Sequence, residues 1–183
     1  MRNLYLRLHV LTTLLLALLS SNSLIAQTFS SYDYQLGPGD QIEILVYGEN
    51  ELNVNTHIGD NGVINYPYIG ELQVTGMTIG GLKKAITTAL KGDYLVNPIV
   101  QISIEQYRPF FIDGEVQVPG GYAFQPGLTI VKAAALAQGF TERASKDKIY
   151  ITRETDGEQQ RLKVDLNTQL RPGDIVTVEQ RFF

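Results

Sequence analysis

Hydrophobic and polar residues alternate in several short stretches of the chain, which is the pattern of half-buried β-strands. The stretch 42–46 places Ile, Ile and Val at every second position, and "IVQISIE" at 99–105 repeats the pattern. Further strands are predicted at 110–113 and 175–178. Turn residues separate these strands: Asp60-Asn61-Gly62 predicts one hairpin and Asp156-Gly157 another.

Two stretches change to helical spacing. The first, 78–92, predicts a helix with Thr78 as N-cap and Gly92 just after its end, and its apolar face is formed by Ile79, Leu82, Ile86, Ala89 and Leu90. The second places Thr129 before a helix over 130–138 that Gly139 ends, and its alanines allow close packing on a sheet.

These elements predict an α+β fold with two small domains. We call residues 34–107 the first unit, which is β-rich with one helix, and residues 108–183 the second unit. The second unit has the order β-β-α-β-β-β, which suits a small curved sheet that grips one helix. Residues 27–33 are polar and predict a flexible lead-in.

The motif Leu-x-Pro-Gly-Asp occurs twice, at 36–40 and at 170–174, and each copy precedes a predicted strand. Proline fixes φ for turn position i+1, and glycine accepts the positive φ of position i+2. The aspartate that follows can accept backbone N–H bonds. We therefore expect strand-initiating turns, with the two leucines in the cores; the structural turn residues are Pro38, Gly39, Asp40, Gly114, Pro119, Gly120, Pro172, Gly173 and Asp174.

Residues 1–26 have the layout of a secretory signal peptide, with Arg2 and Arg7 before a short apolar run. We expect cleavage after Ala26, with Ser23 as the alternative. This leader holds two arginines and no acid, so its removal makes the chain more negative than the net charge of −4. An acidic surface disfavours nucleic acid as a partner. We expect an exported, soluble mature protein.

Candidate catalytic and metal-binding groups are few. The chain has no cysteine, and His57 is the one histidine after the leader. The segment "GDNG" at 59–62 lacks the spacing of an EF-hand. The pairs Asp40/Glu43 and Asp113/Glu115 are read as turn or solvated carboxylates, and the glycine-rich segments lack phosphate-loop spacing. We therefore expect no enzyme activity, no metal and no cofactor.

Several separated motifs resemble the bacterial polysaccharide export proteins of the Wza type. The first unit is similar to their export domain in "YQLGPGDQIEILVYG" (34–48), "GDNGVINYPYIGELQVTGMTIGGL" (59–82) and "YLVNPIVQISI" (94–104). The second unit resembles the SLBB (soluble-ligand-binding β-grasp) domain in "IDGEVQVPGGYAFQPGLTIVKAAALAQGF" (112–140) and "LRPGDIVTV" (170–178).

This resemblance implies a component of a capsular or exopolysaccharide export machine, in the periplasm and associated with the outer membrane. It implies a homo-oligomeric ring around the polysaccharide cargo and work with an inner-membrane polysaccharide co-polymerase. Two features depart from the family: no cysteine is present for lipidation, and no pore-forming helix follows the single SLBB unit. We therefore expect a non-lipidated ring or adaptor beneath a separate outer-membrane protein, a β-barrel. The exported polymer and the residues that contact it are not identified.

A monomeric periplasmic carbohydrate-binding module is the alternative. The aromatic stretches "YRPFF" (107–111) and "NYPYIG" (65–70) can stack on sugar rings or pack within the fold, and we favour packing. Size-exclusion mass measurement separates an oligomeric ring component from a monomeric module. A carbohydrate-active enzyme is disfavoured because the site chemistry is missing.

Overall fold

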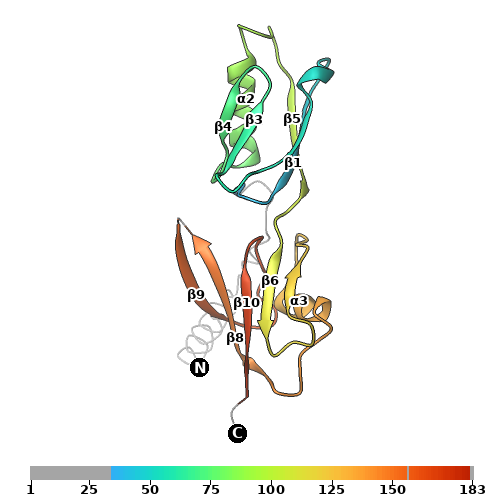
Figure 1. Ribbon diagram of the computed structural model, residues 1–183, viewed down its shortest axis with the longest axis vertical. Helices are drawn as coiled ribbons and strands as arrows, with labels where there is room; N and C mark the ends of the chain where they lie inside the picture. The colour runs from blue at the N-terminus through green and yellow to red at the C-terminus, as the bar shows by residue number, and fades with distance from the viewer. Residues whose placement is uncertain (1–33, 156, 182–183) are drawn as a thin grey trace, which may run out of the picture.

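The computed structural model describes residues 34–155 and 157–181. Its buried hydrophobic side chains form two separate cores, one between Tyr34 and Ile102 and the other between Phe110 and Val178. The two units lie end to end along the long axis of the molecule (Figure 1). No helix in the described ranges is long and apolar enough to cross a lipid bilayer.

The first unit packs a three-stranded sheet against a helix and a hairpin. Strand β1 (Gln41–Val46) lies between β2 (Val54–His57) and β5 (Val100–Gln106) and is antiparallel to both. The short 3-10 helix η1 (Asn50–Leu52) joins β1 to β2, and β3 (Val63–Tyr66) pairs with β4 (Gly70–Gln73) as a separate antiparallel hairpin. Every second residue of β1 is buried, as its alternation predicts.

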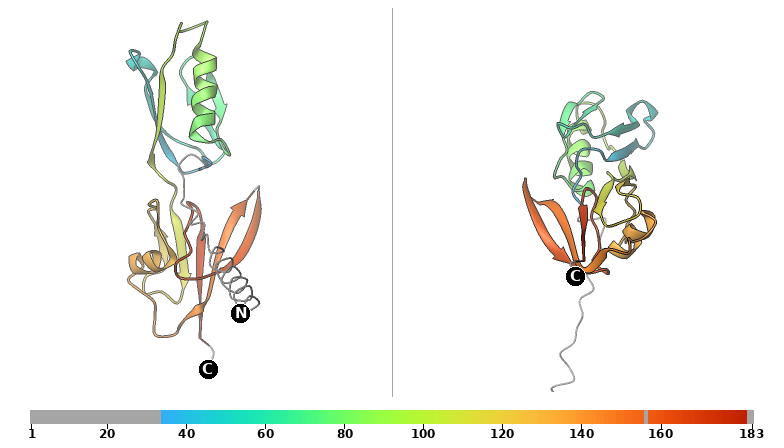
Figure 2. Two further views of the ribbon diagram at one scale, coloured as in Figure 1. Left: turned by 180° about the vertical axis from the view of Figure 1, so that it is seen from behind. Right: turned by 60° about the horizontal axis from the view of Figure 1, so that its bottom comes forward.

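Helix α2 (Ile79–Leu90) covers the inner face of that sheet, which is clearest from behind (Figure 2). The Thr78 side chain accepts a 3.1 Å hydrogen bond from the backbone N–H of Gly81, as expected of an N-cap. Gly92 follows the end of the helix with φ +97°. Leu82 is buried, but Ala89 is exposed, so the apolar face is narrower than the sequence pattern predicts.

The turn at Asp60-Asn61-Gly62 does not make the predicted hairpin. Gly62 has φ +73°, so a turn is present, but the strand before it pairs with β1 and the strand after it pairs with β4. The hairpin turn of this region instead lies between β3 and β4 at Tyr68, a non-glycine residue with φ +63°. The sequence Asp-Asn-Gly predicts a turn, but it does not determine whether the strands on either side of the turn pair with each other.

The second unit is a five-stranded sheet in the order β7-β6-β10-β8-β9. Strand β10 (Ile175–Gln180) runs parallel to β6 (Phe110–Gly114) and antiparallel to β8 (Ala144–Thr155). The edges are β7 (Gly120–Tyr122) and β9 (Glu158–Val164), and the β8–β9 hairpin lies at the predicted place. The predicted order of strands and helix is correct, and the α+β fold with a β-grasp second domain is confirmed.

Helix α3 (Ile130–Leu136) packs Ala133 and Ala134 into the second core. It is shorter than the predicted 130–138, because Gln138 leaves the helix at φ +63°. The side chain of Thr129 makes no capping hydrogen bond, so only the backbone of this residue begins the helix.

Candidate functional site

The first Leu-x-Pro-Gly-Asp turn closes around a buried carboxylate. Gly39 takes φ +88°, and the backbone N–H of Asp40 donates to the carbonyl of Gly37 at 3.2 Å. The Asp40 side chain is fully buried and accepts from the backbone N–H of Gly37 at 2.9 Å. The hydroxyl of Tyr34 donates to the same carboxylate, 2.7 Å from Oδ2. The hydrogen bonding expected of Asp40 is therefore present.

The second turn repeats this arrangement with a different cation. Gly173 takes φ +85°, and the Asp174 carboxylate accepts from the backbone N–H of Arg171 at 2.7 Å. Arg153 on β8 donates from Nε to Oδ1 at 2.8 Å and from Nη2 to Oδ2 at 2.7 Å. Such a two-point pair fixes both the charge and the orientation of the groups. Asp174 is only 1% exposed and the Arg153 side chain 16%, so this ion pair is largely shielded from water.

Arg108, in the linker between β5 and β6, joins the two turns. Its backbone N–H donates to Asp40 Oδ1 at 2.8 Å, and its guanidinium Nη1 lies 3.2 Å from Asp40 Oδ2. The same side chain lies against glycines of both turns: a Cβ at Gly37 would collide with Nη1, and a Cβ at Gly173 would lie 2.9 Å from Nε. The backbone N–H of Gly173 also donates to the carbonyl of Pro109 at 3.1 Å. The repeated motif therefore forms the two sides of one interdomain junction.

Aromatic rings continue this junction from one core to the other. Tyr107 packs edge-on against Tyr34, with ring centroids 5.1 Å apart, and edge-on against Phe124 of the second unit at 5.5 Å. Burial raises the pKa of Tyr34 far above its ordinary value, and the negative charge of Asp40 raises it further. Burial, and then Asp40, also raise the pKa of Tyr107. Both phenols therefore stay protonated at neutral pH, and Tyr34 acts as a hydrogen-bond donor.

The remaining turn residues lie away from this junction. Gly114 ends β6 with φ +80°, and a Cβ there would collide with the carbonyl oxygen of Val178 on β10. This close approach explains the need for glycine at that position. Pro119 is exposed just before β7, Gly120 is exposed as its first residue, and no atom crowds Gly120. Ala26, the expected cleavage position, lies outside the described residues.

The groups considered for catalysis do not come together. His57 is exposed at the end of β2, and Asp40 points into the junction while Glu43 lies on the outer face of β1. In the part of the chain that the structure describes, no group of three or more His, Asp or Glu residues could hold a metal ion. Among the aromatic side chains of the two aromatic stretches, those of Tyr68 and Phe111 are exposed. The other aromatic side chains of these stretches are buried or half-buried.

The junction can orient two domains, but its groups are already committed to one another. Asp40 accepts from Tyr34, from two backbone N–H groups and from Arg108, so no carboxylate lone pair faces an open cleft. Arg108 and Arg153, the ion-pair partners of the two buried aspartates, are the junction residues that sequence reasoning missed. The signal for them was indirect: a buried aspartate requires a cation, but nothing local says which one.

Comparison with known proteins finds a described family for each of the two units. Residues 29–105 match the family described as polysaccharide biosynthesis/export protein, and residues 109–163 match the SLBB domain. The first unit thus matches the polysaccharide biosynthesis/export family and the second unit the SLBB domain, and the resemblance predicted from the sequence motifs is confirmed.

Three curated relatives illustrate the similarity. The exopolysaccharide production protein ExoF of Rhizobium meliloti (strain 1021) is 28% identical over 138 residues, covering 69% of this chain and 32% of the relative. The EPS I polysaccharide export outer membrane protein EpsA of Ralstonia nicotianae (strain ATCC BAA-1114 / GMI1000) is 28% identical over 184 residues, covering 81% of this chain and 48% of the relative. The polysialic acid transport protein KpsD of Escherichia coli is 28% identical over 146 residues, covering 78% of this chain and 26% of the relative. The chain thus spans half or less of the length of these relatives.

Proposed function

We propose that this protein is a non-catalytic component of a machine that exports capsular or exopolysaccharide across the cell envelope. The observation that carries the proposal is the order of the two domains, an export domain followed by an SLBB domain. The relatives named for exopolysaccharide production, polysaccharide export and polysialic acid transport support the same role. The junction around Asp40 supports this role too. Its hydrogen-bonding groups are all paired with one another, so it stabilises the orientation of the two domains and presents no reacting group.

In this role the protein forms part of the translocation conduit as a homo-oligomeric ring or adaptor, with polysaccharide as its cargo. Residues 1–26 direct export and are cleaved after Ala26, which leaves a non-lipidated protein in the periplasm at the outer membrane. Residues 34–107 and 108–183 act as the two domains, an assignment that the two separate cores support. An inner-membrane co-polymerase and a separate outer-membrane β-barrel protein are the proposed partners. A hydrated polymer needs weak, multiple contacts here, so that it enters the conduit and is not trapped.

Gene deletion with complementation tests the proposal. Cells that lack the protein should lose surface polysaccharide while polymer continues to be made inside, and the full chain should restore surface polymer. The matched comparison uses two complementing variants: Asp40→Ala, at a buried residue of the junction, and Glu71→Ala, at an exposed residue of β4. Glu71→Ala should restore surface polymer fully. Unchanged surface polymer in the deletion strain would overturn the export role.

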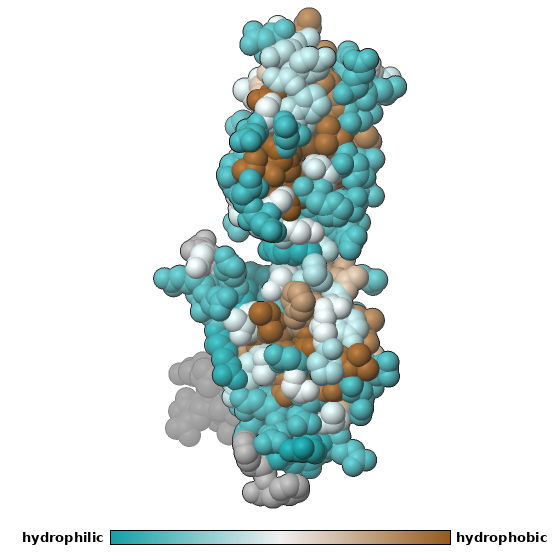
Figure 3. Space-filling view, in the orientation of Figure 1, coloured by the Kyte–Doolittle hydropathy of each residue, from teal (hydrophilic) through white to brown (hydrophobic). Residues whose placement is uncertain are grey.

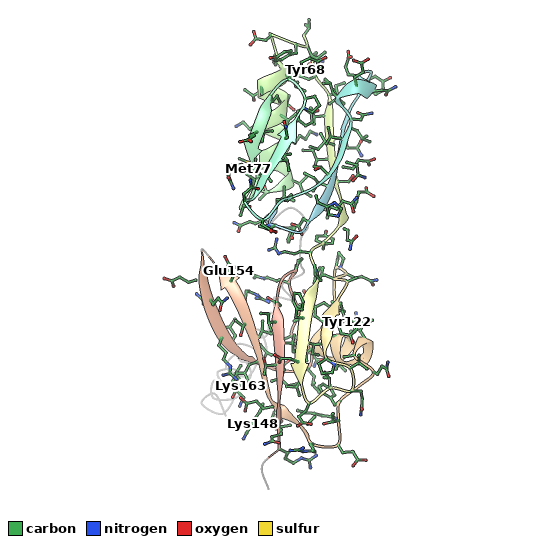
Figure 4. The ribbon with its side chains drawn as sticks, viewed as in Figure 1. Tyr68, Met77, Tyr122, Lys148, Glu154 and Lys163 are labelled. Atoms are coloured by element: carbon green, nitrogen blue, oxygen red, sulfur yellow. The ribbon has the colours of Figure 1, made fainter. Side chains whose placement is uncertain are left out.

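One observation favours a carbohydrate-binding module as the second candidate. Tyr68 and Tyr94 are 64% and 49% exposed, and their ring centroids lie 5.2 Å apart. Figure 4 shows Tyr68 at the end of the first unit that lies away from the second unit. Exposed aromatic rings can stack on sugars. A monomeric mass by size exclusion, together with chemical-shift changes at these two tyrosines on titration with a neutral or an acidic hexasaccharide, would favour this candidate over the export role.

A further inference from the structure

The cations of the first unit all lie on one face. Its three basic residues, apart from His57, are Lys83, Lys84 and Lys91, on helix α2 and at its C-terminal cap. All three are exposed. The spacing of Lys84 and Lys91 places them on the same side of the helix as Thr88. The outer face of α2 is therefore a basic surface, although the whole chain carries a net charge of −4.

Acidic and amide side chains occupy the outer face of the sheet. Burial alternates along β1 and over the first half of β5, so Glu43 and Gln101 point away from the core that their neighbours enter. Glu105 is exposed in the second half of β5 and has the same strand parity as Gln101. Glu49 and Glu51 add negative charge in the loop that follows β1, and both are exposed. We call this the acidic sheet face.

The two charged faces are opposite sides of one layered unit. Leu82, Ile86 and Leu90 of α2 pack in the same core as Ile42 and Ile44, on the inner face of the sheet. The lysines consequently face away from the sheet, and Glu43 and its neighbours face away from the helix. Figure 2 shows α2 and the β1–β5 sheet on opposite sides of the unit, and Figure 3 shows hydrophilic side chains along both of its margins.

Apolar features add a second complementarity at the end of the unit that lies away from the linker. The sheet side carries a groove of about 400 Å³ that includes Tyr47, Ile99 and Gln101 in its lining, with Tyr47 83% and Ile99 57% exposed. The segment that leaves α2 carries exposed apolar side chains of its own, Tyr94 at 49% and Val96 at 91%. A groove thus belongs to the sheet side, and a projection belongs to the segment after the basic helix.

We propose that the first unit binds a second copy of itself head to tail, with the basic α2 face of one copy on the acidic sheet face of the next. Tyr94 and Val96 of one copy then lie in the groove beside Tyr47 of its neighbour. The contact is heterologous, so successive copies close into a ring if the rotation between them permits. This inference rests on the proposed oligomeric role and adds to it the surface that makes the contact.

Charge selects the occupant of the acidic sheet face. An anionic polymer would be repelled by its carboxylates, whereas the lysine-bearing helix of a second copy would be attracted. The same chain supplies both signs and both the groove and the projection, so no other partner is needed to complete the contact. Because exposed charges contribute, high salt should weaken the association.

Cysteine cross-linking tests this contact directly, because the chain contains no cysteine of its own. Thr88→Cys on the helix face and Gln101→Cys on the sheet face leave all charges intact, and both positions are exposed. The full chain carrying both substitutions is expressed in its cells, and the envelope fraction is treated with a short bis-maleimide. We expect a ladder of dimers, trimers and larger products from the double variant and monomer from each single variant. Absence of the ladder, or dimers from a single variant, would overturn the head-to-tail contact.

Charge reversal in the double-cysteine background separates a specific contact from chance collision. Lys84→Glu or Glu105→Lys alone should reduce the cross-linked fraction roughly tenfold, the effect of about 1.4 kcal/mol of lost association energy. The two reversals combined should restore it, because the opposite charges face each other again. Lys163→Glu, the same charge change on β9 of the second unit, should leave the ladder unchanged. If Lys163→Glu abolishes the ladder equally, the proposed surface is wrong.

The two proposals fail in different ways. Loss of surface polymer on gene deletion, without any ladder, leaves the export role intact and removes only this interface. A ladder without any effect of deletion on surface polymer supports the contact and removes the export role.

Discussion

Replacing the buried carboxylate of the junction is the sharpest test of how the two units are held together. Asp40→Ala removes the acceptor for the backbone N–H groups of Gly37 and Arg108, at 2.9 and 2.8 Å, and for the hydroxyl of Tyr34. It also leaves the Arg108 guanidinium without its carboxylate. The alanine side chain is too short to replace any of these contacts, and the site is closed to bulk water, since Asp40 is fully buried.

The magnitude follows from the groups left without partners. Each buried donor without an acceptor costs about 1–3 kcal/mol. The Tyr34 hydroxyl can rotate, and the Arg108 side chain is 28% exposed, so water can still hydrate part of its charge. Counting chiefly the two backbone N–H groups, we expect Asp40→Ala to lower the free energy of unfolding by roughly 3–5 kcal/mol. That is a large share of the roughly 5–15 kcal/mol that stabilises a typical domain.

Urea unfolding of the exported protein, followed by far-ultraviolet circular dichroism and tyrosine fluorescence, measures this loss. The matched control is Glu71→Ala, which removes an exposed carboxylate from β4 and should change the free energy of unfolding by less than about 0.5 kcal/mol. A loss below about 1 kcal/mol for Asp40→Ala would show that the junction is not held by this carboxylate.

Three further predictions concern the second turn and the buried phenol. Asp174→Ala leaves the Arg153 side chain, 16% exposed, without its carboxylate, and should lower the free energy of unfolding of the second unit by roughly 3–5 kcal/mol in urea. Arg153→Lys keeps the positive charge and should lower that free energy clearly less. Gly173→Ala must take φ +85° and place its Cβ 2.9 Å from a guanidinium nitrogen, so it should cost more in the same assay than Gly127→Ala, where φ is +79° and no atom lies within 4 Å; equal losses would contradict the crowding. Burial raises the pKa of Tyr34 above 10.0, so the folded chain holds this phenol's proton more tightly than the unfolded chain, and stability should be full below about pH 10 and fall above it. Urea midpoints measured across that range should decline less steeply in Tyr34→Phe, and an identical decline would refute this account.

Local patterns in the sequence predicted most of the fold. Alternation identified β1 and β5, and Thr78 and Gly92 marked the two ends of α2, because caps and strand periodicity depend on neighbouring residues. The pairing of strands was less accessible. The segment Asp60-Asn61-Gly62 has the composition of a hairpin turn, but its flanking strands belong to different sheets, and that choice is made by the core rather than by the turn.

Only part of the junction could be predicted from the sequence: its turns and aspartates, but not the arginines that pair with them. The turn geometry and the buried aspartates follow from Leu-x-Pro-Gly-Asp itself. Their cations lie 68 residues from Asp40 and 21 residues from Asp174, and no local periodicity connects such positions. The convergence of both turns on Arg108 is a property of the folded chain, because it requires the two units to be placed end to end.

The distance along the chain between Asp40 and Arg108 also orders events during biogenesis. Synthesis from the N-terminus makes Asp40 available 68 residues before Arg108. Until Arg108 has been made, burying that carboxylate would leave it without its cation. Arg108 lies beyond the last strand of the first unit, so the buried carboxylate of this unit and the linker to the second unit are fixed by the same contact.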